Sequence, residues 1–141
     1  MRMLLFGLLL FACTAYAVAL GGRAERIGAT TMFVGCVLTA AVNSPLAVRY
    51  ASVEVAIFAV DAVMLGIFGA IALLSDRYWP LWVTAFQLLV VLAHVAKLLD
   101  PEMLRNGYGF VIAVWSYPQL VAMALGTRAR RRDRPKPADA T

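Results

Sequence analysis

Five long apolar runs alternate with short polar connections along the sequence. They lie at residues 3–20, 27–48, 53–74, 80–99 and 108–126. A helix needs about 20 mainly apolar residues to cross the hydrocarbon core of a bilayer. We expect helices rather than strands, because an open strand would leave backbone hydrogen-bonding groups unpaired in lipid. The sequence therefore predicts an all-α integral membrane protein, with a five-helix transmembrane bundle over residues 1–126.

The composition agrees with lipid as the medium around most side chains. Apolar residues make up 62% of the chain and charged residues only 15%, whereas soluble domains have roughly 45–50% and about 25%. A single core in a chain this small cannot hide the excess. The composition argues against a soluble enzyme, a disordered protein and a nucleic-acid-binding domain. Cys13 and Cys36 lie inside apolar runs, where cysteine behaves as a small hydrophobic residue, so we expect no metal site and no cofactor.

Residues 127–141 form a basic segment after the last apolar run. The segment is too polar to pack into a core, and we predict a disordered cytoplasmic tail. Anionic lipid headgroups are its expected partner, since basic residues beside a membrane are attracted to them. Its basic residues are Arg128, Arg130, Arg131, Arg132, Arg134 and Lys136.

The distribution of basic residues favours one orientation, because cytoplasmic loops collect Lys and Arg. With the N-terminus outside and the C-terminus inside, the inner side holds the six basic residues of the tail together with Arg23, Arg26 and Arg77. The outer side holds Arg2, Arg49 and Arg105. The sequence thus predicts an N-out, C-in protein of a bacterial-type inner (plasma) membrane. The tail decides this prediction, since the other basic residues of the loops and the N-terminus divide three against three and Lys97 lies within a run.

The first apolar run also has features of a cleaved signal peptide. Arg2 precedes a short apolar stretch, and Ala15-Tyr16-Ala17 resembles a small-x-small cleavage site. Cleavage after Ala17 would leave four helices and would export the basic tail, against the bias of the loop charges. We therefore predict that the first run is retained, with cleavage as the alternative.

Five polar residues inside or at the edge of the apolar runs are the candidate site, because polar groups are costly to place in a membrane. They are Glu54, Asp61, Gln87, His94 and Lys97. Runs 53–74 and 80–99 should pack as an antiparallel hairpin, in which residues at equal depth have position numbers with a nearly constant sum. The sum for the pair Glu54 and Lys97 differs by only four from the sum for the pair Asp61 and His94. Divided between the two helices, this difference corresponds to about 3 Å of depth per helix. We predict that Asp61 contacts His94, a coupled pair that is the minimum for a proton relay.

Four of the five candidates also have a structural interpretation. Glu54 suits the first turn of a helix by its interaction with the helix dipole. Lys97 lies near a helix end, from which its amine can reach the headgroups. His94 can be a hydrogen-bonded packing residue, and Asp61 can have a structural partner or be protonated. Beyond these five, Gln119 follows Pro118, and we expect it near backbone groups that the proline releases.

Small residues recur at helical spacing in two runs. Ala62, Gly66 and Ala70 form a small-residue stripe in the run 53–74, and Gly28 and Gly35 lie along one side of the run 27–48. Small residues at this spacing let helix backbones approach closely. The stripe Ala62, Gly66 and Ala70 is therefore a predicted packing face, either within the bundle or toward a partner.

The sequence leaves three functions open and resembles no family that we can name. We expect a non-catalytic accessory or scaffold subunit that packs against itself, as a homo-oligomer, or against a larger membrane complex. The alternative is a small dimeric proton- or cation-coupled transporter or channel that uses Asp61 and His94. An intramembrane enzyme is the weakest of the three, because the chain offers no nucleophile–base pair and no metal cluster.

Overall fold

The computed structural model describes residues 2–42, 55–100, 102 and 105–133, and these fold into five helices. The helices are α1 (Arg2–Leu20), α2 (Arg23–Val42), α3 (Val55–Leu74), α4 (Trp79–Leu99) and α5 (Arg105–Asp133). The all-helical prediction is confirmed for the described residues. Three of these helices, α2, α3 and α4, are long and apolar enough to cross a membrane, while the apolar part of α1 is shorter, at Leu4–Leu20. Five membrane crossings stay a prediction.

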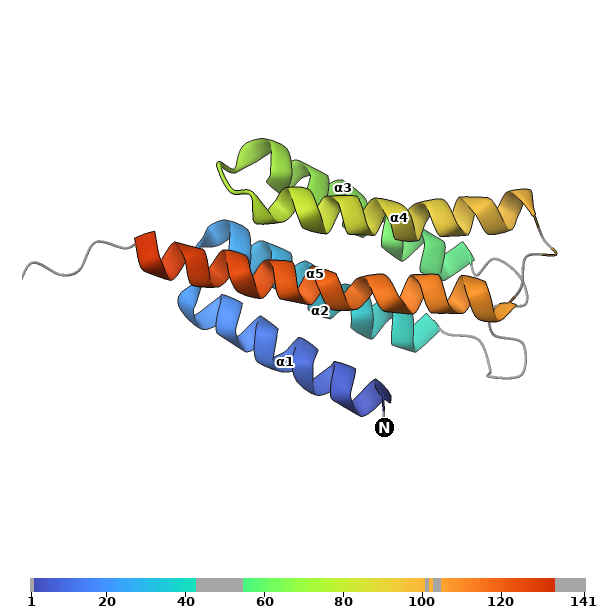
Figure 1. Cartoon of the computed structure of the whole chain (residues 1–141), viewed down its shortest axis with the longest axis horizontal. Helices are drawn as coiled ribbons and strands as arrows, with labels where there is room; N and C mark the ends of the chain where they lie inside the picture. The colour runs from blue at the N-terminus through green and yellow to red at the C-terminus, as the bar shows by residue number, and fades with distance from the viewer. Residues whose placement is uncertain (1, 43–54, 101, 103–104, 134–141) are drawn as a thin grey trace, which may run out of the picture.

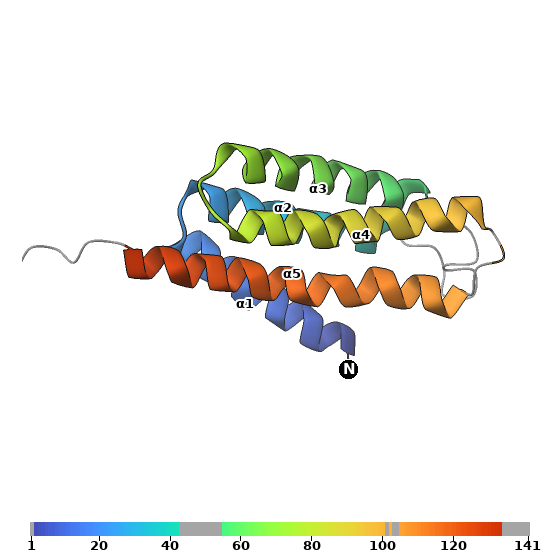
Figure 2. The ribbon, with the colours of Figure 1, turned by 45° about the horizontal axis from the view of Figure 1, so that its top comes forward.

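The helices run alternately up and down and form a closed ring (Figures 1 and 2). Each helix packs against the next one in the chain, and α5 also packs against α1, which closes the ring. The α1–α2 connection, the α3–α4 connection and the C-terminal end of α5 lie at the same end of the bundle (Figure 1). We call this the basic end, because Arg23, Arg26 and Arg77 lie there with the basic residues of α5.

Helix α2 begins at Arg23, four residues before the predicted run. The reason is Glu25 in its first turn, whose Oε2 accepts a hydrogen bond from the backbone N–H of Gly22 at 2.8 Å. This is one half of a capping box, in which a residue at the third helical position closes the helix start. The predicted end of this run, and the start of the next, fall on residues 43–54, outside the described part of the chain.

Helix α5 continues to Asp133, so the prediction that residues 127–133 belong to a disordered tail is wrong. Two contacts involve the extended part of the helix. Thr127, which is fully buried, donates from Oγ1 to the carbonyl oxygen of Met123 at 3.0 Å. Arg77 of the α3–α4 connection forms an ion pair with Asp133 at 3.2 Å. Arg134 and Lys136 lie outside the described residues.

Trp79, at the start of α4, holds the basic end together. Its indole is 5% exposed and lies against Gly28 of α2 and Gly126 of α5. A Cβ added at Gly28 would lie 2.5 Å from the Trp79 ring, and one at Gly126 would overlap the same side chain. The two glycines therefore make room for the largest side chain of the core.

The small-residue stripe of α3 does not pack inside the bundle. Ala62, Gly66 and Ala70 are exposed, and a Cβ built on Gly66 would meet no atom within 4 Å. The intramolecular alternative for this face is therefore wrong. The opposite side of α3, with Met64 and Phe68, faces the core, and helical periodicity turns the stripe away from it.

Candidate functional site: a buried polar network

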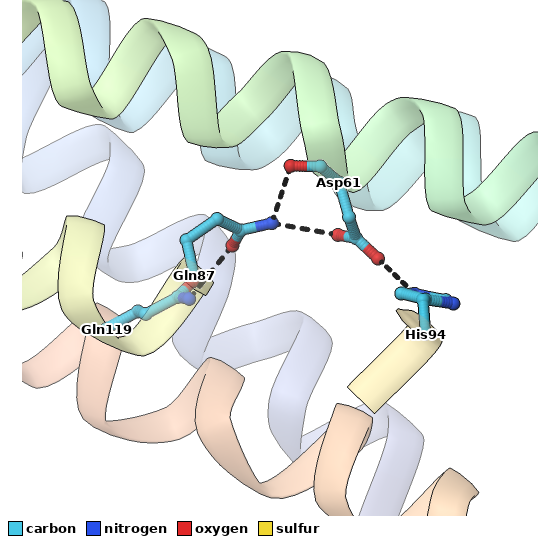
Figure 3. A network of polar contacts seen from close by, with 4 residues as sticks. All are labelled: Asp61, Gln87, His94 and Gln119. Atoms are coloured by element: carbon cyan, nitrogen blue, oxygen red, sulfur yellow. Dashed lines mark hydrogen bonds and ion pairs between the residues drawn. The ribbon is translucent and has the colours of Figure 1, made fainter. Parts of the chain in front are cut away.

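Asp61, the polar residue in the middle of α3, is held by two side chains of α4 (Figure 3). Its Oδ2 lies 3.0 Å from Nε2 of His94. The amide of Gln87 donates to Oδ1 at 3.0 Å and also to the backbone carbonyl oxygen of Asp61 at 3.1 Å. The predicted contact between Asp61 and His94 is thus confirmed, and so is the shared face of Gln87 and His94, which are seven residues apart on one helix.

Gln119 extends the network to a third helix (Figure 3). Its Nε2 donates to Oε1 of Gln87 at 2.9 Å. The side chain of Gln119 therefore bonds a neighbouring helix, whereas its sequence position beside Pro118 suggested backbone groups of its own helix. Sequence reasoning left Gln119 out of the five candidates, although a glutamine in an apolar run was a usable signal.

The network is almost completely shielded from the surroundings of the bundle. His94 is 0% exposed, Gln87 is 2%, Gln119 is 3% and Asp61 is 9%. The ring of Phe58 lies beside His94, with 5.4 Å between the ring centroids. Polar groups in such a medium need hydrogen-bond partners, because an unpaired group there costs free energy. The amide of Gln87 meets this need by donating to Asp61 and accepting from Gln119.

The other candidates are distributed differently. Lys97 is 3% exposed, so its side chain is buried and does not extend to the surface as the headgroup interpretation requires. Glu54 lies outside the described residues, and its pairing with Lys97 stays a prediction. Of the basic tail, Arg128, Arg131 and Arg132 are exposed and Arg130 is half-buried.

Glu25 is a buried carboxylate that the sequence reasoning missed. It is 0% exposed, and besides Gly22 it accepts a hydrogen bond from Nε1 of Trp79 at 3.2 Å. The signal was present, because Glu25 follows Gly22 by three residues, the spacing of a capping box. This carboxylate joins the α1–α2 connection to α4 and lies at the basic end, apart from the network around Asp61.

The network offers a proton-sharing pair and little other chemistry. Asp61 and His94 lie close enough to share a proton across their 3.0 Å contact. Among the residues that the structure describes, no group of three or more His, Cys, Asp or Glu side chains has the arrangement of a metal site. A comparison with protein-family models found no match, and comparisons with curated proteins and with solved structures found none either.

Proposed function

We propose that this chain is a multi-pass protein of a bacterial-type inner membrane, oriented N-out and C-in, and that it acts as a non-catalytic accessory or scaffold subunit. Its partner is a second copy of the chain or a transmembrane helix of a larger complex. The exposed small-residue stripe Ala62, Gly66 and Ala70 of α3 carries the proposal. In lipid, helices associate by close packing of small residues, and a face that the bundle itself does not use is available for a partner.

Two further observations support the membrane placement. Large apolar side chains are exposed around the bundle, among them Leu73 at 88%, Leu74 at 87% and Leu99 at 82%. Monomeric soluble proteins rarely expose so much apolar surface. Helix α1 also packs against α2 and α5, with Ala17 fully buried. Removal of α1 as a signal peptide would uncover that core surface, which favours its retention.

The proposal is tested by placing a large side chain in the stripe and measuring whether the partner is lost. We expect Gly66→Leu to remove a copurifying or cross-linked partner from the detergent-solubilised protein, with a corresponding fall in the mass of the complex. Ala85→Leu is the matched control, since Ala85 is an exposed small residue of α4 and should leave the complex intact. Equal masses for the wild type, Gly66→Leu and Ala85→Leu would contradict the proposal.

A second candidate function rests on the Asp61–His94 contact at 3.0 Å. It is a proton- or cation-coupled transporter or channel, which would have to be oligomeric because so small a bundle can hardly enclose a conduit alone. Proton flux into liposomes decides between the two functions. Flux that the wild type supports and Asp61→Asn abolishes would replace the scaffold by the transporter, whereas equal background flux from both proteins is expected for a scaffold.

A further inference from the structure

A narrow apolar groove of about 630 Å³ runs along the outer side of the bundle between α2 and α3. Its walls include Thr30 and Leu38 of α2, and Ala59, Val63 and Ile67 of α3. Apart from two threonines, the polar residue of this lining is Arg26, which lies near the start of α2 at the basic end. The groove is therefore apolar along its length and cationic at one end.

The length of the groove matches one leaflet of a bilayer. On α2 its lining extends from Arg26 to Leu38, and twelve residues of helix rise about 18 Å. Half of a hydrocarbon core about 30 Å thick is about 15 Å. The groove thus begins at the depth of the headgroups and ends near the middle of the bilayer, if the basic end lies at the membrane surface.

The groove is too narrow to enclose a helix. A volume of about 630 Å³ spread over about 18 Å gives a mean cross-section of about 35 Å². A helix with its side chains is about 10–12 Å across, which is a cross-section of roughly 80–110 Å². The groove therefore fits an extended hydrocarbon chain. The surface proposed for a partner helix is the small-residue stripe of α3, which is not part of the groove lining.

The charge at the end of the groove selects the headgroup. A guanidinium binds phosphate oxygens in a bidentate manner, and basic pockets between membrane helices on the cytoplasmic side bind anionic headgroups. Arg26 is exposed and is the charged residue of the groove lining. We propose that the groove binds one acyl chain of an anionic glycerophospholipid and that Arg26 holds its phosphate.

The proposal rests on the membrane placement stated above and is tested on the full chain. The protein is reconstituted in vesicles of equal parts phosphatidylglycerol and phosphatidylcholine, extracted in mild detergent and examined by native mass spectrometry. We expect one retained phosphatidylglycerol per chain. Arg26→Gln should lower this retention about tenfold, whereas Arg23→Gln, on the same turn but outside the groove lining, should keep it.

A second pair of variants tests the seat of the acyl chain. Val63→Phe fills the groove and should abolish retention of either lipid, while Leu73→Phe, on an exposed part of α3 outside the lining, should retain the lipid. Equal retention of both lipids, or unchanged retention by Arg26→Gln or Val63→Phe, would overturn the site. A second copy that is bound by the wild type and lost with Val63→Phe would assign the groove to a dimer interface instead.

Flotation of the same vesicles tests the membrane placement separately from the lipid site. Protein that floats with the vesicles and survives alkaline washing but retains no lipid would overturn the lipid site alone. Protein that does not float would overturn the membrane placement on which the proposed function also depends.

Discussion

At the scale of single residues, Asp61 determines whether the buried polar side chains of α4 have hydrogen-bond partners. Its carboxylate and backbone carbonyl together accept from Gln87, and its second oxygen contacts His94. Removal of the carboxylate therefore affects two side chains of α4 at once. A buried polar group left without its partner costs about 1–3 kcal/mol, whereas an amide in place of the carboxylate can still bond both neighbours.

This leads to a comparison of two variants at one position. We expect Asp61→Leu to lower the free energy of unfolding in detergent by about 2 kcal/mol more than Asp61→Asn, because leucine leaves the amide of Gln87 without its side-chain acceptor. Thermal unfolding followed by circular dichroism would measure the difference. Indistinguishable midpoints for the two variants would show that the network contributes nothing specific to the fold.

At the scale of helices, glycine has opposite roles on two helices of the bundle. Gly28 of α2 lies against the rigid ring of Trp79, while a Cβ on Gly69 of α3 would meet nothing within 4 Å. The same substitution should therefore have opposite effects at the two sites. Alanine at Gly28 must displace a buried indole, an overpacking that typically costs 1–3 kcal/mol, whereas alanine within an open helix face gains about 0.5–1 kcal/mol in helix propensity.

We thus expect Gly28→Ala to lower the unfolding midpoint and Gly69→Ala to leave it unchanged or raise it slightly. The near-ultraviolet circular dichroism of Trp79 should change only in the first variant, since only there does the added methyl group press on the ring. A loss of stability in Gly69→Ala equal to that in Gly28→Ala would contradict this prediction, because it would mean that another segment packs against α3 at Gly69.

At the scale of the whole molecule, the alternating helices place most of the described arginines at one end. Arg23, Arg26 and Arg77 share this end with the last turns of α5 (Figure 1), although they are far apart in the sequence. The ion pair between Arg77 and Asp133 lies at the surface, with Arg77 partly and Asp133 largely exposed, and such a pair contributes little to stability. We predict that the basic end sets the orientation instead, because Lys and Arg are retained on the cytoplasmic side of a membrane.

Orientation is testable with one cysteine at each end, in a chain with Cys13→Ala and Cys36→Ala. Asp76 lies at the basic end and Glu102 between α4 and α5 at the other, and both are exposed. We expect Asp76→Cys to react with a membrane-impermeant maleimide only in inverted vesicles, and Glu102→Cys only in intact spheroplasts. The reverse pattern would establish an N-in protein and would refute the prediction from the charges.

The five helices of the described residues, their order and the matched positions of Asp61 and His94 in one hairpin followed from the sequence alone. Run length and stop signals are local, and depth in a hairpin depends only on the rise per residue, so the meeting of Asp61 and His94 was predictable. The local sequence does not determine which face of a uniformly apolar helix packs against the core. That face is set by packing against neighbours, because periodicity marks a core face only where the other face is polar.

Tertiary structure therefore decided which small-residue face became core, with Gly28 and Gly35 inside and Gly66 outside. It also decided that Gln119 reaches Gln87 across a helix interface. The burial of Glu25 has the same origin, because its partner Trp79 lies more than 50 residues away in the sequence. Such contacts exist only once the ring of helices has closed.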